Sequence, residues 1–316
     1  MRVFITGIGG FVGSRLARYL LEQGDQVSGT YIGAPPRMSG VAHVDLHEVD
    51  LLDLKTLKRA VGEAEPDALV NLAGLSSIGS SWKEARMPDY FWVNLVGTEN
   101  LLAAAAGRKV VIASSADVYG APDSEVVDER APLRPANVYA ATKVASEALV
   151  HEFAGRRAAA TTVLRPANQI GPRQHPGLAA SAFAKQIAEA EAGLAEPVVR
   201  HGLLDPRRDF LDVRDMAAAY AFAADLSEPG ATVYNVGTGQ AVSVAEILET
   251  LIRLARVPMR AELDPERVRS GAAATFALDS GRFRRRTGWA PKIDLRTSLA
   301  DTLEYWRGQV RAEVRA

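Results

Sequence analysis

The sequence predicts an α/β protein built on a doubly wound, parallel sheet, with a smaller, discontinuous second domain. Short apolar runs with strand character alternate with helical stretches through the first half of the chain, the pattern of a parallel sheet with crossover helices. A glycine-rich turn follows the first run directly, and the texture changes after Pro166. We therefore expect one domain from residues 1–166 and 211–236, and a second from residues 167–210 and 237–316.

The elements of the first domain follow from apolar periodicity. Val12, Leu16 and Leu20 recur every four residues, which predicts a helix with one face on the sheet, and Gly24 provides its C-terminal stop. Strands are expected at Val3–Thr6, Gln26–Thr30, His43–Val49, Ala68–Leu72, Lys109–Ala113 and Thr161–Leu164, and further helices at Asp89–Ala106 and Val138–Phe153.

The second half of the chain has a different texture. Residues Gly171–Gly177 form a loop rich in helix breakers, and a helix is expected over Ala179–Ala192. Phe210–Val213 and Thr232–Asn235 are predicted to be short strands that rejoin the first domain. From Ser243 onward the chain is expected to be mostly helical with loops.

Charge and cysteine content exclude several classes of protein. The 316 residues carry 37 basic and 38 acidic side chains, without the basic excess or stripe of a nucleic-acid-binding protein. The one dense basic run, Arg284-Arg285-Arg286, is interpreted as a solvated helix end. The absence of cysteine excludes disulfides, thiolate catalysis and cysteine metal sites. It also fits a reducing compartment, and no metal site is expected.

The N-terminus indicates where the protein works. Met1–Thr6 enters a strand at once, which leaves no room for a signal peptide. No apolar run approaches the ~20 residues that span a bilayer. We therefore expect a cytoplasmic protein without a membrane partner.

The turn after the first strand has the features of a dinucleotide site. Its glycines are spaced as G-x-x-G-x-x-G through Gly7, Gly10 and Gly13, because Val12 stands where the G-x-G-x-x-G pattern needs glycine. Glycine lets the backbone approach a pyrophosphate, and the helix N-terminus offers unpaired N–H groups to the anion. The predicted fold is thus Rossmann-like, with Phe11 and Val12 also at the cofactor.

The residues at the end of the second strand indicate whether the enzyme prefers NAD or NADP. An acid there holds the ribose of NAD and a cation favours NADP, but the chain has Gly29-Thr30-Tyr31-Ile32. The missing acid favours NADP, or the use of both, with Thr30 beside the ribose. Asp50, next to Leu51, either accepts from the adenine amino group or caps the helix that follows.

Tyr139 and Lys143 are the candidate catalytic pair, because positions i and i+4 share one helix face. An ammonium and a cationic nicotinamide would lower the phenol pKa from about 10. Taken alone, the spacing is better explained by a core tyrosine beside a solvated lysine. Ser115 follows a strand at its carboxyl end, where such sheets bind ligands, and Asn94 either contacts the cofactor or is a satisfied buried amide.

Several motifs in order give the chain a family resemblance. They are T-G-x-x-G-F-x-G, D-L-L-D, N-L-A-G, N-x-x-G-T, S-S-A-D-V-Y-G and Y-x-x-x-K. The chain resembles the extended short-chain dehydrogenase/reductases, which act on nucleotide-activated sugars. The resemblance implies Tyr139 as acid–base group, Lys143 as its electrostatic partner and Ser115 as hydrogen-bond donor to a carbonyl. It also places Leu72, Ala73, Gly74 and Asn94 at the cofactor.

Within this family the chain is most similar to the GDP-4-keto-6-deoxy-D-mannose reductases and GDP-mannose 4,6-dehydratases. The similarity rests on Leu72–Ser77 with Ser81-Trp82, and on Phe183–Ile187, Glu196–Val199 and Arg208–Phe210. It implies that NAD(P)H reduces the C4 ketone of a 4-keto-6-deoxyhexose. The alternative is a nucleotide-sugar 4-epimerase, or a 4,6-dehydratase, with tightly held NAD(P). An intact catalytic set argues against a non-catalytic nucleotide sensor.

The same resemblance implies a binding site for the nucleotide sugar. Arginine suits a diphosphate because its planar fork donates to two oxygens at once. Relatives carry a glutamate where this chain has Ala272, which changes the surroundings of the second arginine. The implied substrate-binding residues are Ser76, Asn168, Lys185, Arg208 and Arg269.

Asp117 bears on the type of reaction. If the segment after the fifth strand stays extended, Ser115 and Asp117 project to the same side. The dehydratases carry glutamate at the Asp117 position and threonine at the Ser115 position. The dehydratases that act on dTDP-sugars use two adjacent acids, Asp-Glu. This chain has Ala116-Asp117 at these positions, so one of the two acids is missing. A catalytic role and a solvated or capping aspartate both remain open.

Relatives commonly dimerise through their two long helices. In this chain these are the predicted helices at Asp89–Ala106 and Val138–Phe153, which would form a four-helix bundle with a second copy. Apolar residues such as Val144, Leu149 and Val150 suit that interface or the core of one chain equally well.

Overall fold

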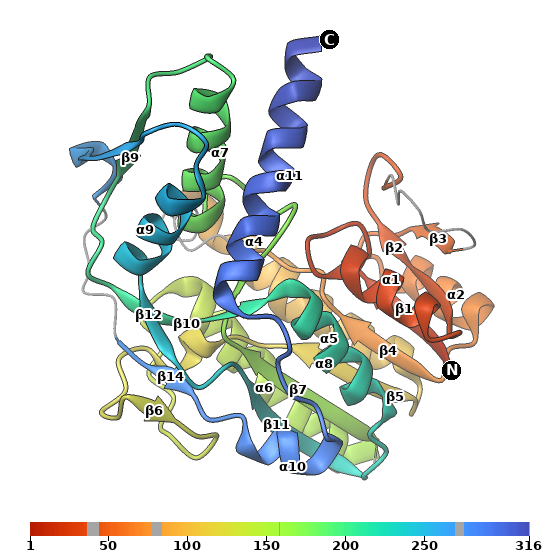
Figure 1. Cartoon of the computed structure of the whole chain (residues 1–316). Helices are drawn as coiled ribbons and strands as arrows, with labels where there is room; N and C mark the ends of the chain where they lie inside the picture. Colours follow the sequence, from red (N-terminus) through yellow and green to blue (C-terminus); the bar gives the residue numbers. More distant parts are fainter. Residues whose placement is uncertain (37–43, 77–83, 158, 269–274, 316) are drawn as a thin grey trace.

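A seven-stranded parallel sheet forms the centre of the first lobe (Figure 1). The computed structural model describes residues 1–36, 44–76, 84–157, 159–268 and 275–315. The strand order is β11-β7-β5-β4-β1-β2-β3, and all neighbours are parallel. This confirms the Rossmann-like fold. The strands are β1 Arg2–Thr6, β2 Gln26–Tyr31, β3 Asp45–Glu48, β4 Ala68–Asn71, β5 Lys109–Ala113, β7 Ala160–Pro166 and β11 Gly230–Val236.

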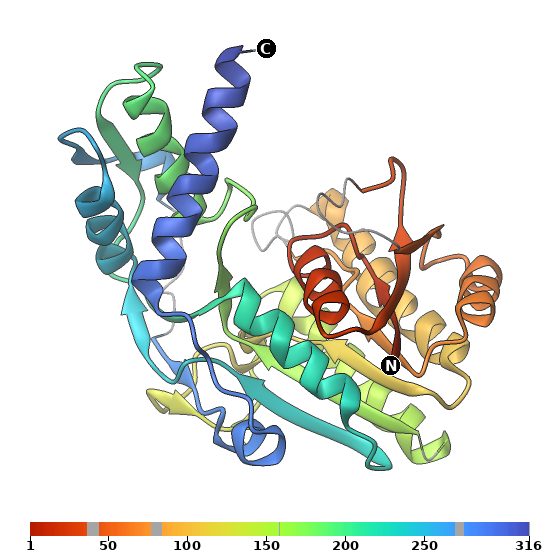
Figure 2. The same ribbon diagram turned by 45° about the vertical axis from the view of Figure 1, so that its right-hand side comes forward.

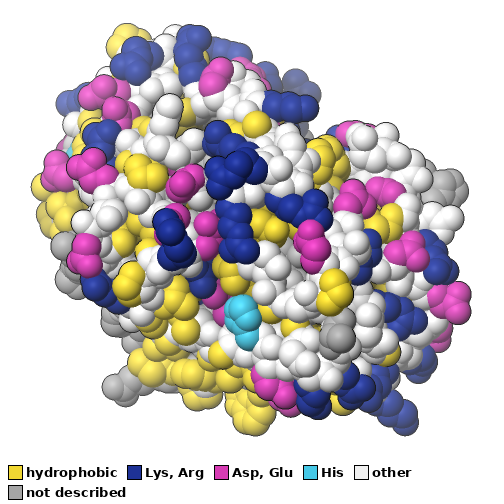
Figure 3. All heavy atoms as spheres, turned by 90° about the horizontal axis from the view of Figure 1, so that it is seen from below, with side chains coloured by type: hydrophobic (Ala, Val, Ile, Leu, Met, Phe, Trp, Pro, Cys, Tyr) yellow, Lys and Arg dark blue, Asp and Glu magenta, His cyan; other side chains and the backbone are white. Residues whose placement is uncertain are grey.

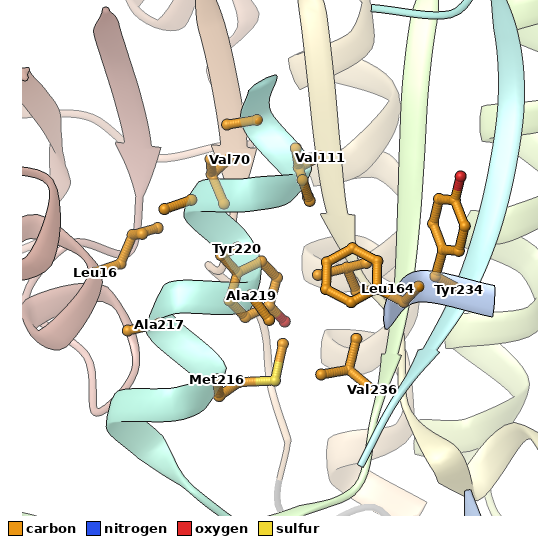
Figure 4. Packing of buried hydrophobic residues seen from close by; sticks show 14 of the residues in the cluster. Leu16, Val70, Val111, Leu164, Met216, Ala217, Ala219, Tyr220, Tyr234 and Val236 are labelled. Atoms are coloured by element: carbon orange, nitrogen blue, oxygen red, sulfur yellow. The ribbon is translucent and has the colours of Figure 1, made fainter. Parts of the chain in front are cut away.

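Helices cover both faces of this sheet, as doubly wound topology requires. On one face, α1 (Gly13–Glu22) and α8 (Val213–Asp225) pack on the strands. Figure 4 shows Tyr220 and Met216 of α8 reaching toward Leu164 and Val111 of the sheet. On the other face lie α2 (Leu54–Ala64), α5 (Gly97–Ala105) and α6 (Val138–Arg157). The ligand-binding edge is therefore the carboxyl end of the strands.

The helix predicted at Asp89–Ala106 is divided by a π-helical turn. The structure has α4 (Met87–Phe91), the wide turn Trp92–Val96 and then α5. The hydroxyls of Thr98 and Ser146 both donate to the Asn94 carbonyl, at 2.7 and 2.9 Å. These side chains compete with the regular helical bonds for that oxygen. Such π-turns often mark functional sites.

The second lobe is built around a small sheet and three helices (Figures 1 and 2). Its sheet contains β8 (Asn168–Ile170), β10 (Arg207–Asp212) and β12 (Ala241–Ser243), in the order β12-β10-β8. Figure 2 shows this lobe to one side of the main sheet, with the long C-terminal helix upright. Its apolar core lies among the helices α7 Ala179–Glu191, α9 Val244–Leu254 and α11 Leu295–Arg315.

One predicted strand belongs to a different sheet from the one expected. Thr232–Asn235 lies within β11 and joins the large sheet beside β7, as predicted. Phe210–Val213 does not rejoin it, because β10 pairs with β8 and β12 instead. The buried Asp209 carboxylate fixes β10 there by accepting from Thr238, Gly239 and Leu278. The sequence pattern does not contain this long-range pairing.

The remaining differences concern short elements. The third strand is shorter than predicted, and His43 lies outside the described residues. The region after Ser243 also contains strands β13 (Arg260–Leu263), paired with β9 (Val198–His201), and β14 (Ala277–Leu278), paired with β6 (Val126–Val127). As predicted, the arginine run closes a helix, α10 (Gly281–Thr287).

The predicted domain boundaries stay a proposal, which the packing modifies. The second-lobe core draws on residues of α7, α9 and α11. By contrast, Phe276, Phe283 and Trp289 pack into the core of the first lobe with α8 and the sheet. We therefore propose that the segment 276–289 belongs to the first lobe, although the sequence division places it in the second.

The surface carries both signs of charge. On the face shown in Figure 3, Lys and Arg side chains are interspersed with Asp and Glu, which agrees with the formal net charge of −1. No helix among the described residues is both long and apolar enough to cross a membrane.

Candidate active site

The glycine turn after β1 leaves no room for side chains. Gly7 has a φ of +68°, and a Cβ there would lie 2.9 Å from the backbone of Ala73. A Cβ on Gly13 would lie 2.3 Å from the Gly7 carbonyl oxygen. Gly10 donates to that same carbonyl at 3.0 Å. The turn leads straight into α1, with Val12 as its N-cap residue, so a helix N-terminus faces this turn.

Buried hydroxyls and an amide connect this turn to the end of β4. The Thr6 hydroxyl donates to Asn71 at 2.6 Å and accepts from the Ala73 amide at 3.2 Å. The Asn71 amide then donates to the Thr98 hydroxyl at 3.2 Å. The T-G and N-L-A-G motifs therefore form one connected unit at the carboxyl ends of β1 and β4.

Asn94 is a satisfied buried amide that joins three elements. It is 3% exposed, accepts from the Leu75 amide at 2.8 Å and donates to the Leu75 carbonyl at 3.0 Å. It also donates to the Thr142 hydroxyl of α6 at 3.0 Å. A Cβ on Gly74 would lie 2.9 Å from the Asn94 carbonyl oxygen and 3.7 Å from Lys143 Nζ. The π-turn thus holds the loop after β4 against the lysine.

The structure brings Ser115, Tyr139 and Lys143 together. Tyr139 and Lys143 lie on one face of α6, with the lysine Nζ 5.8 Å from the tyrosine ring centroid. The Lys143 ammonium donates to the Ala113 carbonyl at the end of β5, at 2.8 Å. The Ser115 side chain lies near enough to Tyr139 to act on the pKa of the phenol. A phenol, a hydroxyl and an ammonium therefore meet at one sheet edge.

Burial is the main influence on the pKa values of this cluster. The lowering of the tyrosine pKa by the ammonium and a bound cationic nicotinamide stays a prediction. Burial raises the pKa of Tyr139 above its ordinary value, and the nearby Ser115 side chain only partly opposes this rise. Burial also lowers the pKa of Lys143 to about 8, against the charge of Glu147. The lysine amine bonds to a backbone carbonyl rather than to the phenol. Burial therefore has the largest effect on the pKa of the phenol.

Asp117 lies in a tight turn rather than an extended segment. Ala116–Tyr119 is a 3₁₀ turn, and Ser115 caps it by accepting from the Asp117 amide at 3.1 Å. The carboxyl of Asp117 is neither a cap nor fully solvated. Burial raises its pKa, and Arg208 opposes that rise. Since its charge also acts on Tyr139, Asp117 belongs to the same cluster.

Arg208 reaches this cluster from the second lobe. Its guanidinium lies over the Phe276 ring, 5.4 Å from the centroid, and donates to the Arg207 carbonyl. Phe276 in turn meets the Tyr119 ring edge-on at 6.3 Å. Asn168 lies on the neighbouring strand, in register with Phe210, and donates to the Asp209 carbonyl. Two of the predicted substrate residues are therefore adjacent.

The structure places the other predicted residues less directly. Thr30 is 2% exposed, and its hydroxyl accepts from the Gly7 amide, beneath the turn. Lys185 pairs with Glu189 and lies over Trp306, toward α11. Ser76 is an exposed residue after β4. Ser77, Ser81, Trp82, Arg269 and Ala272 lie outside the described residues.

Asp50 does not cap the following helix. Asp53 does, by accepting from the Lys55 and Thr56 amides, whereas Asp50 is exposed and accepts from the Leu52 amide. The capping interpretation is therefore wrong, and the adenine contact stays a prediction. Leu51 is buried, with its carbonyl bonded to Asn100 at 2.8 Å.

Two arginines near the glycine turn were missed by sequence reasoning. Arg15 of α1 donates to the Pro172 carbonyl at 3.3 Å, and Arg173 donates to the Ser14 hydroxyl at 3.1 Å. Arg173 has a φ of +77°, a strained conformation for an arginine. They bring cations from both lobes to the start of α1, and spacing gives no signal for such a contact.

A buried ion pair beneath the cluster was missed as well. Glu147 and Arg165 are 3% and 5% exposed and pair at 2.6 Å. Glu147 lies one helical turn beyond Lys143, so the i, i+4, i+8 series from Tyr139 contained a usable signal. No group of three or more potential metal ligands occurs among the residues with described positions.

Comparison with known proteins places the chain in a family. The family model described as GDP-mannose 4,6 dehydratase matches residues 4–302. A GDP-6-deoxy-D-mannose reductase of Pseudomonas aeruginosa is 33% identical over 99% of both chains. The structure of RMD from Pseudomonas aeruginosa with NADPH is 30% identical with a TM-score of 0.84, over 98% of this chain and 99% of that one. A UDP-glucose 4-epimerase of Thermus thermophilus with NAD is 29% identical with a TM-score of 0.84, over the same shares.

The chain belongs to the GDP-mannose 4,6-dehydratase family of extended short-chain dehydrogenase/reductases. It is an NAD(P)-dependent enzyme of the class that contains nucleotide-sugar reductases and epimerases. The residues present fit this cofactor, because Gly7 and Gly13 let the turn pack closely on Ala73 and on the Gly7 carbonyl, and the turn leads into the N-terminus of α1, where a pyrophosphate binds.

Proposed function

We propose that this protein reduces the C4 ketone of a GDP-linked 4-keto-6-deoxyhexose with NADPH or NADH. The observation that carries the proposal is the buried Tyr139 phenol, with Ser115 beside it and Lys143 one helical turn away. The full-length similarity to a GDP-6-deoxy-D-mannose reductase supports the choice of sugar and nucleotide.

In this proposal Ser115 and Tyr139 act on the C4 oxygen of the sugar, and Lys143 acts on Tyr139. Reduced nicotinamide supplies the hydride when bound. Ser115 donates to the carbonyl oxygen and holds it against Tyr139, and Tyr139 gives its proton as the alkoxide develops. The raised pKa of Tyr139 keeps the phenol protonated and ready to act as an acid. Lys143 in its ammonium form stabilises the phenolate that remains.

The cofactor would be held at the carboxyl ends of β1 and β4. We assign its pyrophosphate to Gly7, Gly10, Phe11, Val12 and Gly13, with Arg15 and Arg173 as nearby cations. The nicotinamide half would lie along Leu72, Ala73 and Gly74 toward Lys143, with Asn94 as a positioning residue behind them. Asp50 and Leu51 are assigned to the adenine side, and Thr30 supports the turn from below.

We propose NADPH as the preferred reductant. β2 ends at Tyr31, and the next residue, Ile32, is 70% exposed, so the described end of this strand has no carboxylate to hold ribose hydroxyls. The reductase structure with NADPH agrees with this choice. Comparing the affinities of NADPH and NADH by fluorescence titration tests it, and tighter binding of NADH would contradict it.

The nucleotide diphosphate would bind at the second lobe. Arg208 and Asn168 lie on adjacent strands facing the cluster, and we assign them to phosphate oxygens. Ser76 and Arg269 remain assignments from the sequence alone. Lys185 is a weaker candidate than the sequence indicated, because its ammonium is engaged with Glu189 and Trp306.

The second candidate function is a nucleotide-sugar 4-epimerase. It is favoured by the structural match to a UDP-glucose 4-epimerase with NAD, since Ser115, Tyr139 and Lys143 can serve both reactions. A 4,6-dehydratase needs an additional acid and base, and the partly buried Asp117 is the one carboxyl acting on Tyr139 in the described cluster. A non-catalytic nucleotide sensor would not need the intact catalytic set of Ser115, Tyr139 and Lys143.

The test is an assay of reduced-cofactor consumption. The purified protein is given GDP-4-keto-6-deoxymannose with NADPH or NADH, and the absorbance of the reduced cofactor is followed. Consumption equal to the sugar product supports the reductase. Isomerisation of a UDP- or GDP-hexose without consumption would replace it with the epimerase.

We also propose a homodimer that pairs through the α4 side of the first lobe. Phe91 and Trp92 are 45% and 57% exposed there, while Val150 of α6 is buried and Leu149 packs on the core of the chain. Trp92→Glu should shift the mass measured by light scattering to that of a monomer. The expected cytoplasmic location stays a prediction.

A further inference from the structure

A buried polar network lies directly beneath the catalytic cluster. Glu147 accepts from the Ser114 hydroxyl at 2.5 Å and from Arg165 through Nε and Nη2, at 3.0 and 2.6 Å. Arg165 also donates to the Tyr119 hydroxyl at 2.9 Å, and that hydroxyl donates to Asn235 at 2.6 Å. All five residues are at most 5% exposed.

Three of the four catalytic candidates lie beside a member of this network, either in sequence or one helical turn away. Ser115 follows Ser114, and Lys143 precedes Glu147 by one turn of α6. Asp117 shares a 3₁₀ turn with Tyr119. A shift of the Glu147 carboxylate would therefore move the end of β5 and the charge facing the lysine at the same time.

The surroundings of Lys143 contain few other charges. Among the described residues, the titratable side chains that act on the Tyr139–Lys143 pair or its network are Tyr90 of α4, Asp117 of the 3₁₀ turn, Tyr220 of α8, Arg165 of β7 and Glu129 of the loop after β6. Burial is the main influence on Lys143, and Glu147 is the charge that opposes it. A buried ammonium without such a carboxylate would release its proton more easily.

We propose that Glu147, held by Arg165 and Ser114, is the positioning residue that keeps Lys143 protonated and fixes the end of β5 beside it. The assignment of chemistry to Lys143 and Tyr139 rests on the proposed function. The role of Glu147 is to supply a fixed negative charge one turn behind the ammonium. It touches neither sugar nor cofactor.

Cofactor binding tests this inference without any sugar substrate. The dissociation constant of NADPH is measured by tryptophan fluorescence from about pH 6 to about pH 10. We expect wild-type affinity to fall as the pH rises through about 8, because an ammonium binds ribose oxygens better than an amine. Lys143→Met should be weaker and should lose this pH dependence.

Glu147→Gln should move the alkaline loss of affinity to lower pH by about one unit. The uncompensated Arg165 cation would add to the effect. If this variant does not fold, the double variant Glu147→Gln/Arg165→Met removes both buried charges together, which proteins tolerate better than one. It should show a smaller shift in the same direction.

A matched control is available in the second lobe. Glu191 and Arg307 are each 8% exposed in their side chains and pair at 2.6 Å, between α7 and α11. Glu191→Gln removes the same kind of buried charge at a distance from Lys143, and its NADPH profile should keep the wild-type pH dependence.

Three outcomes overturn the inference. They are an unchanged profile in both Glu147 variants, an equal shift in Glu191→Gln, and a wild-type profile that Lys143→Met does not alter. Failure of the sugar assay alone would remove the proposed reductase function and leave this inference standing.

Discussion

The two lobes each bury one carboxylate–arginine pair, and the two pairs have different surroundings. Glu147–Arg165 in the first lobe bonds to a serine and a tyrosine that border the catalytic cluster. Glu191–Arg307 in the second lobe bonds to the Leu254 carbonyl, the Arg256 amide and Glu304, and joins α7 to α9 and α11. The same chemistry therefore orients reacting groups in one lobe and fastens helices in the other.

The two lobes also differ in the groups that they contribute to the site: the first lobe contributes the catalytic groups and the second contributes substrate-binding residues. The first lobe holds the phenol, the ammonium and the glycine turn on rigid strand ends and helix starts. The second lobe contributes Arg208 and Asn168 from a small sheet. Substitutions in the first lobe should change kcat and cofactor binding, whereas those in the second should change the KM for the sugar nucleotide.

The largest expected effect is that of Tyr139→Phe on turnover. Removing the proton donor should lower kcat about 10²- to 10⁴-fold, with NADPH affinity nearly unchanged. The measurement is NADPH consumption with the keto sugar, and Tyr305→Phe, on α11, is the control. Full activity in Tyr139→Phe would contradict the assignment of chemistry to the first lobe.

Removing one partner of either buried ion pair should destabilise the fold. Glu147→Gln leaves the buried Arg165 without its carboxylate partner, at a cost of about 3–5 kcal/mol. Glu191→Gln should cost less, because Arg307 keeps its ion pair with Glu304. Urea denaturation monitored by circular dichroism measures both. A loss of stability in both variants, with a catalytic defect in Glu147→Gln alone, would support the comparison. Equal catalytic defects in the two variants would contradict it.

Arg208→Met should act on substrate binding. Losing a charge-assisted contact to phosphate should raise the KM for the nucleotide sugar about 10- to 100-fold, with a smaller change in kcat. Arg253→Met, a solvated arginine on α9, should leave both parameters unchanged. A loss confined to kcat would move Arg208 from the binding residues to the catalytic ones.

Lys143→Met should stabilise the protein while weakening its cofactor site. Burial lowers the pKa of Lys143 from 10.5 to about 8, so the folded state binds this proton less tightly than the unfolded state. Below pH 8 the buried ammonium therefore costs stability, and the variant should gain about 1–3 kcal/mol at pH 7. The gain should shrink as the pH rises from about 8 toward 10.5, and thermal melts across that range check the sign.

Asp117→Asn should have the smallest effect. The Asp117 charge raises the pKa of Tyr139, so its removal should lower that pKa and move the alkaline limit of reductase activity to lower pH. We expect less than about a tenfold change in kcat. A loss of about 10²-fold or more would instead indicate acid–base work by Asp117, as the dehydratase alternative requires.

The sequence predicted the site best where the residues concerned are neighbours along the chain. Gly7 and Gly13 were identified from spacing, because a strand–turn–helix with no room for Cβ needs glycine there. Tyr139 and Lys143 were paired from helical periodicity. The π-turn at Asn94 and the sheet to which β10 belongs were missed, because both depend on bonds to residues far away in sequence.

The sequence by itself determined the fold class, the cofactor turn and the family, since periodicity, glycine spacing and ordered motifs are properties of neighbouring residues. Only the tertiary structure decided the pKa values of the catalytic groups and the partners of the charged side chains around them. Burial raises the pKa of Tyr139 and lowers that of Lys143, Arg208 crosses from the second lobe to Asp117, and Glu147 pairs with Arg165 beneath them. Desolvation and contacts between lobes depend on the whole folded chain, and no local pattern records them.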